Sequence, residues 1–304
     1  SLMAVTPSIE QLSLMADALR GADLRTKSVE SIKTALSEFL SGYSPIAIGR
    51  SSHQIWFRAR LCSGPSGYSS LHEMIYPPSG CPDFGRAQLP GSSVLYASWN
   101  APTALDEVGA QSGSHVQIIR LRPIEGVDIP CHVVGEYQKF HQSGGSLVNS
   151  EKLIGSLAQI QDANPTDFVR SVFIDSFISE LFRYPAKRSF EYKITAAYSE
   201  LLHLGAGGLI YPSVESLGAM NLAVPARVFD TKFEVVDTKV WTVEEAFGYG
   251  IYSLSPLRSS CDFDESGVIR WDSKMRRDFS WTPQTGIRER KHIAGWRKSN
   301  PDKR

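Results

Sequence analysis

Apolar residues recur at helical spacing near the start of the chain. Residues 8–20 and 27–40 each carry them three or four positions apart, which is the period of an amphipathic helix. Ser8, with Gln11 three residues later, is typical of a capping box at the start of the first helix. Pro45 follows the second segment. The pattern therefore predicts a pair of short helices before Pro45.

Farther along, helical spacing alternates with short runs of β-branched and aromatic residues. Helices are predicted for residues 101–109, 165–182 and 189–204. Strands are predicted for residues 94–97, 116–121, 209–211, 222–225 and 233–236. Asn100 and Pro102 favour a helix start at this point, as a cap and a first-turn proline. This alternation predicts a mixed α+β fold with short strands.

One stretch breaks both patterns. Residues 61–90 are rich in glycine, proline and serine, which predicts an irregular loop. Long loops in compact domains are commonly binding loops, so we expect this one to cover a binding site.

The composition is that of an ordinary globular protein with a sizeable core. Of the 304 residues, 42% are hydrophobic and 21% are charged. No run of about 18 apolar residues occurs, and the start lacks the basic-then-apolar pattern of a secretory leader. Four cysteines without CxxC spacing fit a reducing compartment. We expect a cytoplasmic protein that contacts no membrane.

A net charge of zero hides an asymmetry. From Arg270 onward the chain carries 11 Lys and Arg residues against four Asp and Glu residues. Such a tail can act as an electrostatic arm toward nucleic acid, an acidic partner or the body of the protein, or it can simply be solvated. It lacks the interleaving of aromatic and basic residues that single-strand binding uses, so a nucleic-acid partner is not favoured.

Several catalytic motifs are missing from the sequence. Residues 205–208 are glycine-rich but complete neither the GxGxxG nor the P-loop pattern, which argues against dinucleotide redox binding and NTP hydrolysis. No GxSxG elbow occurs. No histidine or cysteine group has metal-ligand spacing, so we predict no metal.

Three chemically distinct side chains lie on successive predicted elements between residues 84 and 108. Arg86 follows a glycine in the loop, Tyr96 lies on a short strand, and Glu107 lies in the next helix. The planar fork of an arginine suits phosphate oxygens. Together the three would suit an anionic, ring-bearing ligand such as a nucleotide, although each alone also fits a plain surface or core position. Asp106 points about 100° away around the helix, and we expect it to be solvated.

Two other places supply candidate residues. Arg58 and Arg60 alternate on a predicted strand and therefore share one face. Ser213 follows Tyr211 by two positions at a strand end, where its hydroxyl either caps the backbone or reaches a ligand. Tyr211 equally fits core packing.

Five short motifs occur in a fixed order along the chain. They are WFRAR at residue 56, GR at 85, YAS at 96, TALDE at 103 and YPS at 211. Their order resembles the RES domain, a family named for its arginine, glutamate and serine, over roughly residues 50–255. The family usually carries asparagine two residues after the loop arginine, where this chain has Gln88.

The resemblance implies an α+β fold like that of ADP-ribosyltransferases. Two small mixed sheets would form a cleft around NAD, with helices at their flanks. The chain would then divide into an N-terminal helical extension (residues 1–45), a RES catalytic domain (46–255) and a basic C-terminal extension (256–304).

It also implies a reaction and roles for the candidate residues. NAD is the expected substrate, and the bond between nicotinamide and ribose is cleaved through an oxocarbenium-like state that Glu107 stabilises, without a metal. Arg86, with Arg58 or Arg60, would anchor the pyrophosphate. Tyr96 would clamp the nicotinamide side. Tyr211 and Ser213 complete the implied substrate-binding set, and Ser213 is counted with Glu107 and Arg86 as catalytic.

The acceptor of the ADP-ribose stays open at this point. We favour phosphate or water as acceptor, which would make the protein an NAD-degrading toxin enzyme of bacteria, restrained by a cognate antitoxin. A protein acceptor would make it a mono-ADP-ribosyltransferase. As a third alternative the fold serves only as a binding module, with Gln88 marking lost catalysis. The N-terminal helices could dimerise, bind the antitoxin or complete the core.

Overall fold

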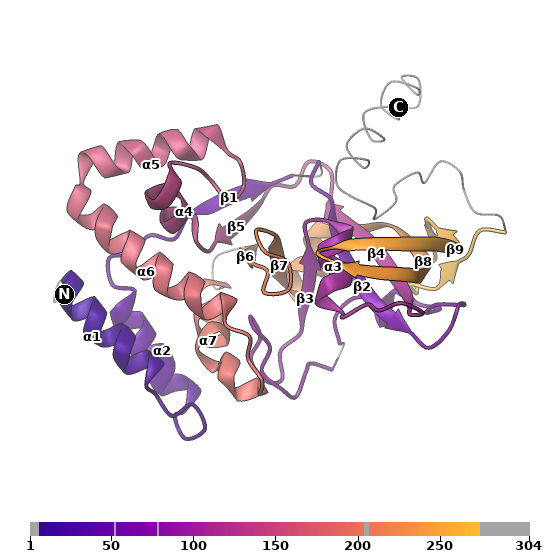
Figure 1. Ribbon diagram of the computed structural model, residues 1–304, viewed down its shortest axis with the longest axis horizontal. Coiled ribbons are helices and arrows are strands. Elements are labelled where there is room, and N and C mark those ends of the chain that lie inside the picture. The colour runs from indigo at the N-terminus through magenta and orange to yellow at the C-terminus, as the bar shows by residue number, and fades with distance from the viewer. Residues whose placement is uncertain (1–5, 52, 78, 204–206, 274–304) are drawn as a thin grey trace.

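The chain folds into one large sheet flanked by helices. A computed structural model describes residues 6–51, 53–77, 79–203 and 207–273 (Figure 1). Within these ranges the helices and strands form a mixed α+β architecture, which confirms the predicted fold class. Most of the basic tail predicted for residues 256–304 lies outside the described residues.

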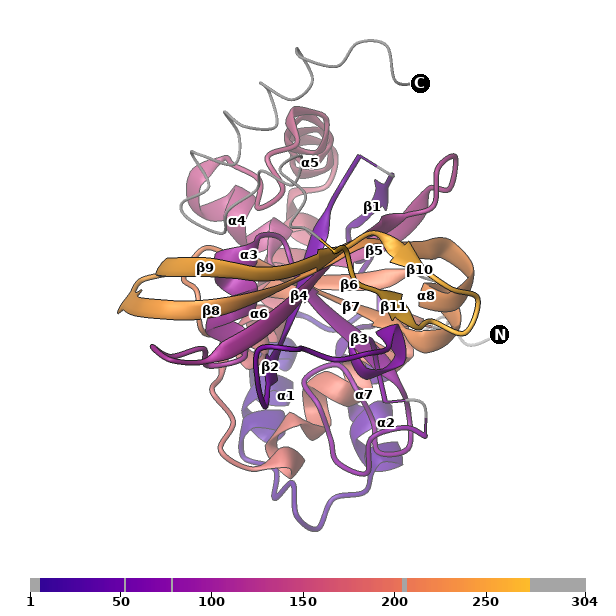
Figure 2. The same ribbon diagram turned by 90° about the vertical axis from the view of Figure 1, so that its right-hand side faces the viewer.

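Nine strands form the sheet. Their spatial order is β1 (Ala47–Arg50), β5 (Ile129–Val133), β6 (Gly208–Pro212), β7 (Met220–Pro225), β3 (Val94–Ser98), β2 (Trp56–Cys62), β4 (His115–Pro123), β8 (Phe233–Gly248) and β9 (Ile251–Ser260). Neighbours are antiparallel except for β5 and β6. Two short strands, β10 (Asp262–Phe263) and β11 (Ile269–Arg270), pair separately. At one edge β8 and β9 extend as a long two-stranded arm (Figure 2).

The sheet is nearly divided in the middle. Strands β2 and β3 pair at a single position in the described residues, Phe57 opposite Ser98, whereas β2 and β4 pair along the whole of β2. The predicted two small sheets are therefore two halves of one sheet, of five and four strands. Helix α3 (Ala101–Glu107) packs on both β2 and β3 and so bridges the division.

Helices gather on the five-stranded half. Helices α1 (Ile9–Arg20), α2 (Val29–Phe39), α6 (Pro165–Arg183) and α7 (Lys193–His203) lie together, with α6 and α7 against β6 (Figure 1). Helices α4 (Glu136–Ser143) and α5 (Glu151–Ala163) pack on α6, and α8 (Ala226–Lys232) packs on β7 and β8. None of the helices in the described ranges is both long and apolar enough to cross a membrane.

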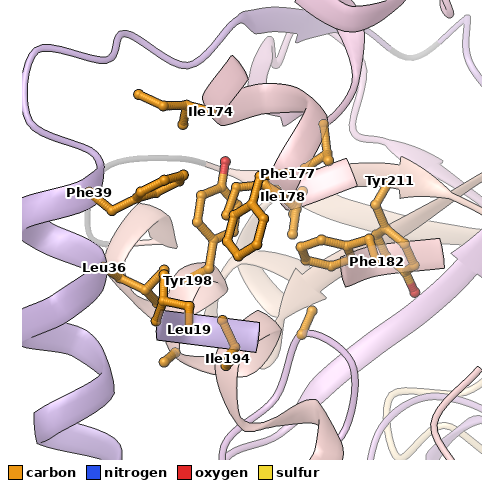
Figure 3. Close-up of a cluster of buried hydrophobic side chains, with 14 of the residues drawn as sticks. Leu19, Leu36, Phe39, Ile174, Phe177, Ile178, Phe182, Ile194, Tyr198 and Tyr211 are labelled. Atoms are coloured by element: carbon orange, nitrogen blue, oxygen red, sulfur yellow. The ribbon is translucent and has the colours of Figure 1, made fainter. Parts of the chain in front are cut away.

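The N-terminal helices share a hydrophobic core with the rest of the protein. Phe39 of α2 meets Phe177 of α6 edge to face, with ring centroids 5.1 Å apart. Leu36 and Tyr198 belong to the same buried cluster (Figure 3). Full burial of a large apolar side chain contributes about 1.5–3 kcal/mol. The first two helices thus complete the core, one of the three alternatives left open by the sequence.

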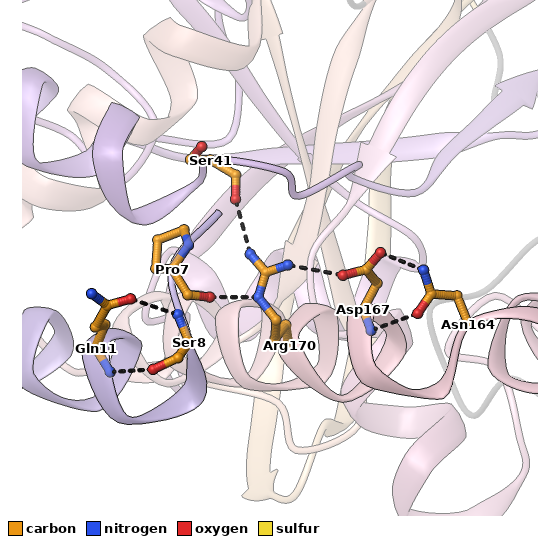
Figure 4. Close-up of polar contacts among 7 residues, drawn as sticks. All are labelled: Pro7, Ser8, Gln11, Ser41, Asn164, Asp167 and Arg170. Atoms are coloured by element: carbon orange, nitrogen blue, oxygen red, sulfur yellow. Dashed lines mark hydrogen bonds and ion pairs between the residues drawn. The ribbon is translucent and has the colours of Figure 1, made fainter. Parts of the chain in front are cut away.

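Polar contacts reinforce this attachment. The buried side chain of Arg170 on α6 donates from Nε to the carbonyl of Pro7 (2.6 Å) and from Nη2 to that of Ser41 (3.2 Å), just before α1 and just after α2 (Figure 4). It also pairs with Asp167. Lys193 on α7 donates to the carbonyl of Leu24 in the connection between the two helices. Both ends and the connection of the helical pair are therefore held by buried cations.

Candidate functional site

A cavity of about 340 Å³ opens where the two halves of the sheet diverge. Phe57 and Ser98, the pair that joins the halves, both line it. So do five of the residues that the sequence singled out: Arg58, Arg86, Tyr96, Glu107 and Tyr211. Its volume falls within the range of roughly 300–1,000 Å³ that is usual for small-molecule sites.

Glu107, the last residue of α3, is held from behind by two donors. The hydroxyl of Ser213 and the Nδ2 of Asn221 both donate to its Oε1, each over 2.6 Å. Its Oε2 accepts no hydrogen bond from the described residues. The carboxylate is therefore fixed through one oxygen, while the residue remains solvent-exposed on the cavity side. Ser213 itself is buried behind the lining.

Asn221 on β7 has its own orientation fixed. The hydroxyl of Ser98 on β3 donates to its Oδ1 over 2.7 Å, which leaves the Nδ2 to point at Glu107. Asn221 is only 4% exposed. Neither residue was predicted from the sequence. The available signal was an asparagine inside the apolar run MNLAV, because a buried amide must find partners.

Arg58 reaches the cavity from β2 and is anchored by the backbone. It donates from Nε to the carbonyl of Met74 (2.7 Å) and from Nη1 to that of Tyr96 (2.8 Å). Its Nη2 makes no hydrogen bond to the described residues. Desolvation, and secondly the nearby charge of Arg60, lowers the pKa of Arg58 to about 10, so it stays protonated at neutral pH.

Arg86 is anchored by the helical side of the protein. Its Nη1 donates to the carbonyls of Phe182 and Tyr184 at the end of α6, the latter over 3.1 Å. Its guanidinium also lies 4.9 Å from the ring centroid of Tyr192, whose hydroxyl accepts from Nη2 (3.3 Å). Tyr192 lines the cavity as well and was not predicted.

The loop that carries Arg86 fits closely around Tyr96. The Tyr96 hydroxyl accepts from the backbone N–H of Ala87 over 3.1 Å. A Cβ on Gly85 would lie 2.7 Å from the same hydroxyl, so a side chain there would displace the ring or the loop. Gln88 is 5% exposed, exchanges backbone hydrogen bonds with Gly85 and does not line the cavity. Desolvation raises the pKa of Tyr96, which keeps it neutral.

Two predicted binding residues do not face the cavity directly. The guanidinium of Arg60 donates to the carbonyl of Glu73 and lies 5.2 Å from the ring centroid of Tyr68, outside the lining. Of the two strand arginines, Arg58 is thus the one at the cavity. Ser213 reaches it only through Glu107. Tyr211 lines it while also packing on Phe182, with ring centroids 5.1 Å apart.

The expectation that Asp106 is solvated was wrong. Its carboxylate accepts hydrogen bonds from the hydroxyls of Ser216 and Tyr252. Ser216 belongs to the turn between β6 and β7, and Tyr252 to β9. Asp106 therefore ties α3 to two segments that are distant in the sequence, a role that its position on the helix could not reveal.

The charges of the cavity are separated. Arg58 and Arg86 lie beside Tyr96, the first through its backbone and the second through the adjoining loop. Glu107 lies beside Asn221, which pairs with Ser98 two positions farther along β3. Two residues of a strand span about 7 Å. The cavity thus has a basic end and an acidic end, the latter also lined by Glu215.

In the part of the chain that the structure describes, no cluster of three or more His, Cys, Asp or Glu side chains could hold a metal ion. The chemistry available to the lining residues is ionic, aromatic and hydrogen-bonding.

Comparisons with known proteins give little further guidance. No protein-family model and no curated protein matches the chain. Among solved structures, a chain of the crystal structure of the M. tuberculosis MbcT-MbcA toxin-antitoxin complex resembles it, with 11% sequence identity and a TM-score of 0.33. That match covers 64% of this chain and 85% of the other. A likeness at this level is too weak to assign a function.

Proposed function

We propose that this protein is an enzyme of the RES type that cleaves the bond between nicotinamide and ribose in NAD. The observation that carries the proposal is the separation of charge in one cavity, with Arg58 and Arg86 at one end and Glu107 at the other. A pyrophosphate suits the first end. The positive charge that develops on the ribose as the bond breaks suits the second.

In the proposed reaction Glu107 acts by its charge. The bond between the ribose C1′ and the nicotinamide nitrogen breaks, and its electron pair leaves on the nicotinamide, which becomes neutral. The ribose is left as an oxocarbenium-like cation, which the Oε2 of Glu107 faces. Ser213 and Asn221 hold Oε1 in advance. A charge oriented beforehand stabilises the transition state without reorganising during the reaction.

The remaining lining residues would bind the substrate. The Nη2 of Arg58 and the Nε of Arg86 carry N–H groups that are not engaged by the described residues, and both would donate to the pyrophosphate. Tyr211, which pairs with Asn221 across the sheet, would hold the nicotinamide side, whereas Tyr96, beside the two arginines, would contact the adjacent ribose. We assign Ser213 to positioning Glu107 rather than to direct contact with NAD, and Arg60 to supporting the strand.

The proposal is tested by NAD consumption with purified protein. Glu107→Gln removes the charge at constant size, and we expect turnover to fall by roughly 10²–10³-fold. Glu125→Gln, at an exposed position outside the cavity lining, is the matched control and should retain the wild-type rate. Equal rates for the wild type and a folded Glu107→Gln protein would refute the assignment.

The same experiment separates the alternatives. Label from NAD that stays on protein after denaturation would indicate a protein mono-ADP-ribosyltransferase. NAD binding without turnover would indicate a binding module. An antitoxin remains a proposed partner, because a cell that makes an NAD-degrading enzyme must restrain it.

A further inference from the structure

A second carboxylate stands at the acidic end of the cavity. Glu215 lines the same cavity as Glu107 and is solvent-exposed. It lies in the turn between β6 and β7. That turn is closed by the N–H of Ser213 donating to the carbonyl of Ala219 (2.9 Å) and by the N–H of Ser216 donating to the hydroxyl of Ser213 (3.0 Å). The turn that orients Glu107 therefore also carries Glu215.

Hydrogen bonds also join the turn between β6 and β7 to helix α3. Ser216, the residue after Glu215, donates its hydroxyl to Asp106 on α3. Tyr252 on β9 holds the other oxygen of the same carboxylate. Glu215 is thus carried by a turn that contacts both Glu107 and Asp106 of α3, and its carboxylate makes no hydrogen bond to the described residues.

Positive and negative side chains lie at different ends of the cavity. Among the described lining residues the cations are Arg58 and Arg86, and both lie at the end beside Tyr96. The acidic end carries Glu107 and Glu215, with Asp106 behind them. Like charges repel, so an anion that approaches the ribose from this end is disfavoured, whereas a neutral molecule is not.

We propose that Glu215 selects the acceptor of the ADP-ribosyl group: it admits water and excludes inorganic phosphate. This inference rests on the proposed function. The bond from C1′ to the nicotinamide nitrogen breaks and its electron pair leaves with nicotinamide. The oxygen of water forms the new bond to C1′, and one proton of that water passes to the Glu215 carboxylate and then to solvent. The products are nicotinamide and ADP-ribose.

The test compares wild type, Glu215→Gln and the control Glu125→Gln. Each is incubated with NAD at increasing phosphate concentration and constant ionic strength, and the products are separated by mass. Wild type and control should release ADP-ribose at a rate that does not depend on phosphate. Glu215→Gln should hydrolyse NAD about 10²-fold more slowly, because the proton acceptor is lost. Phosphorylated ADP-ribose, which the wild type should not form, should appear among its products as the repulsion is removed.

Methanol serves as a neutral competitor of water. It should yield methylated ADP-ribose with the wild type, at the expense of ADP-ribose, at concentrations where phosphate yields no product.

Other outcomes overturn the inference in distinguishable ways. Phosphorylated ADP-ribose from the wild type in proportion to phosphate would refute acceptor selection while leaving NAD cleavage in place. A Glu215→Gln protein with the product ratio and rate of the control would refute the role of Glu215. Absence of NAD cleavage by the wild type in every buffer would remove the proposed function and the inference with it.

Discussion

Asn221 illustrates how neighbouring groups fix the orientation of a single side chain. Its amide lies between Ser98 on β3 and Glu107 at the end of α3, and it accepts from Ser98 and donates to Glu107. A buried amide without partners would destabilise the fold, so the pairing is needed for stability as well as for orientation. The hydroxyl of Ser98 decides which end of the amide faces the carboxylate.

We predict that Asn221→Ala lowers kcat for NAD cleavage by roughly 10–100-fold, as is typical of groups that orient a functional side chain. KM should change less, since the substrate-binding arginines are untouched. Ser98→Ala should act in the same direction but more weakly. Steady-state kinetics on proteins with matching thermal unfolding give the answer, and an unchanged kcat for Asn221→Ala would contradict the positioning role.

Helix α4 shows how one element depends on another. Its N-cap is Gly135, with φ of 97°, which offers no side chain to the free N–H groups of the first turn. Asp175 on α6 takes over, because its two oxygens accept from the N–H groups of Gly135 (2.9 Å) and Gln138 (3.0 Å). It also accepts from the hydroxyl of Tyr43. One carboxylate therefore joins α4 to α6.

The cap has a pH dependence whose sign follows from its burial. Asp175 is 1% exposed, and desolvation raises its pKa from an ordinary 3.8 to about 6. Between these values the folded protein binds a proton that the unfolded chain does not. Stability from this group is therefore greatest at low pH and falls as pH rises toward 6.

We predict that wild type loses about 2–3 kcal/mol of unfolding free energy relative to Asp175→Asn between pH 4 and pH 7. The variant lacks the titrating group, so other pH effects cancel in the difference. Urea unfolding of both proteins at each pH measures it. If the difference in unfolding free energy between the two proteins does not change with pH, or if wild type gains stability as pH rises, burial does not raise the pKa of Asp175.

The molecule as a whole depends on the helical pair at its N-terminus. Residues of α1 and α2 fill one side of the cluster that also contains Tyr211, a lining residue of the cavity. Arg86 is in turn anchored on the end of α6, which packs against α1. The N-terminal helices, the core and the basic end of the cavity form one continuous structure. The predicted boundaries at residues 45 and 255 remain predictions.

We predict that Arg170→Ala lowers the free energy of unfolding by roughly 2–4 kcal/mol, because the carbonyls of Pro7 and Ser41 lose a buried charged donor. Arg183→Ala on the same helix is the control, since Arg183 is exposed, and it should change stability by less than about 0.5 kcal/mol. Chemical denaturation compares the two. Similar small losses for both would mean that Arg170 does not hold the helical pair.

Short-range signals in the sequence were sufficient to predict structure that forms between residues close together along the chain. The capping box forms between Ser8 and Gln11, and Asn100 accepts from the N–H of Thr103 at the start of α3. The pairings of distant segments were not predictable in this way. Residues 233–236 were predicted as a short strand, yet β8 continues to Gly248, paired with β4 as far as Thr242 and with β9 to its end.

By itself the sequence determined the α+β class, the main helices and the order of the motifs that supply Arg58, Arg86, Tyr96, Glu107 and Tyr211. Periodicity, caps and turns act between residues that are close along the chain, so they can be read there. Only the tertiary structure decided that Arg58 rather than Arg60 lines the cavity and that Glu215 lines its acidic end. It alone also showed that Asn221 donates a hydrogen bond to Glu107 and that Asp106 accepts one from Tyr252. Those facts depend on strand pairing and desolvation between segments that lie as much as 146 residues apart along the chain, for which no local pattern exists.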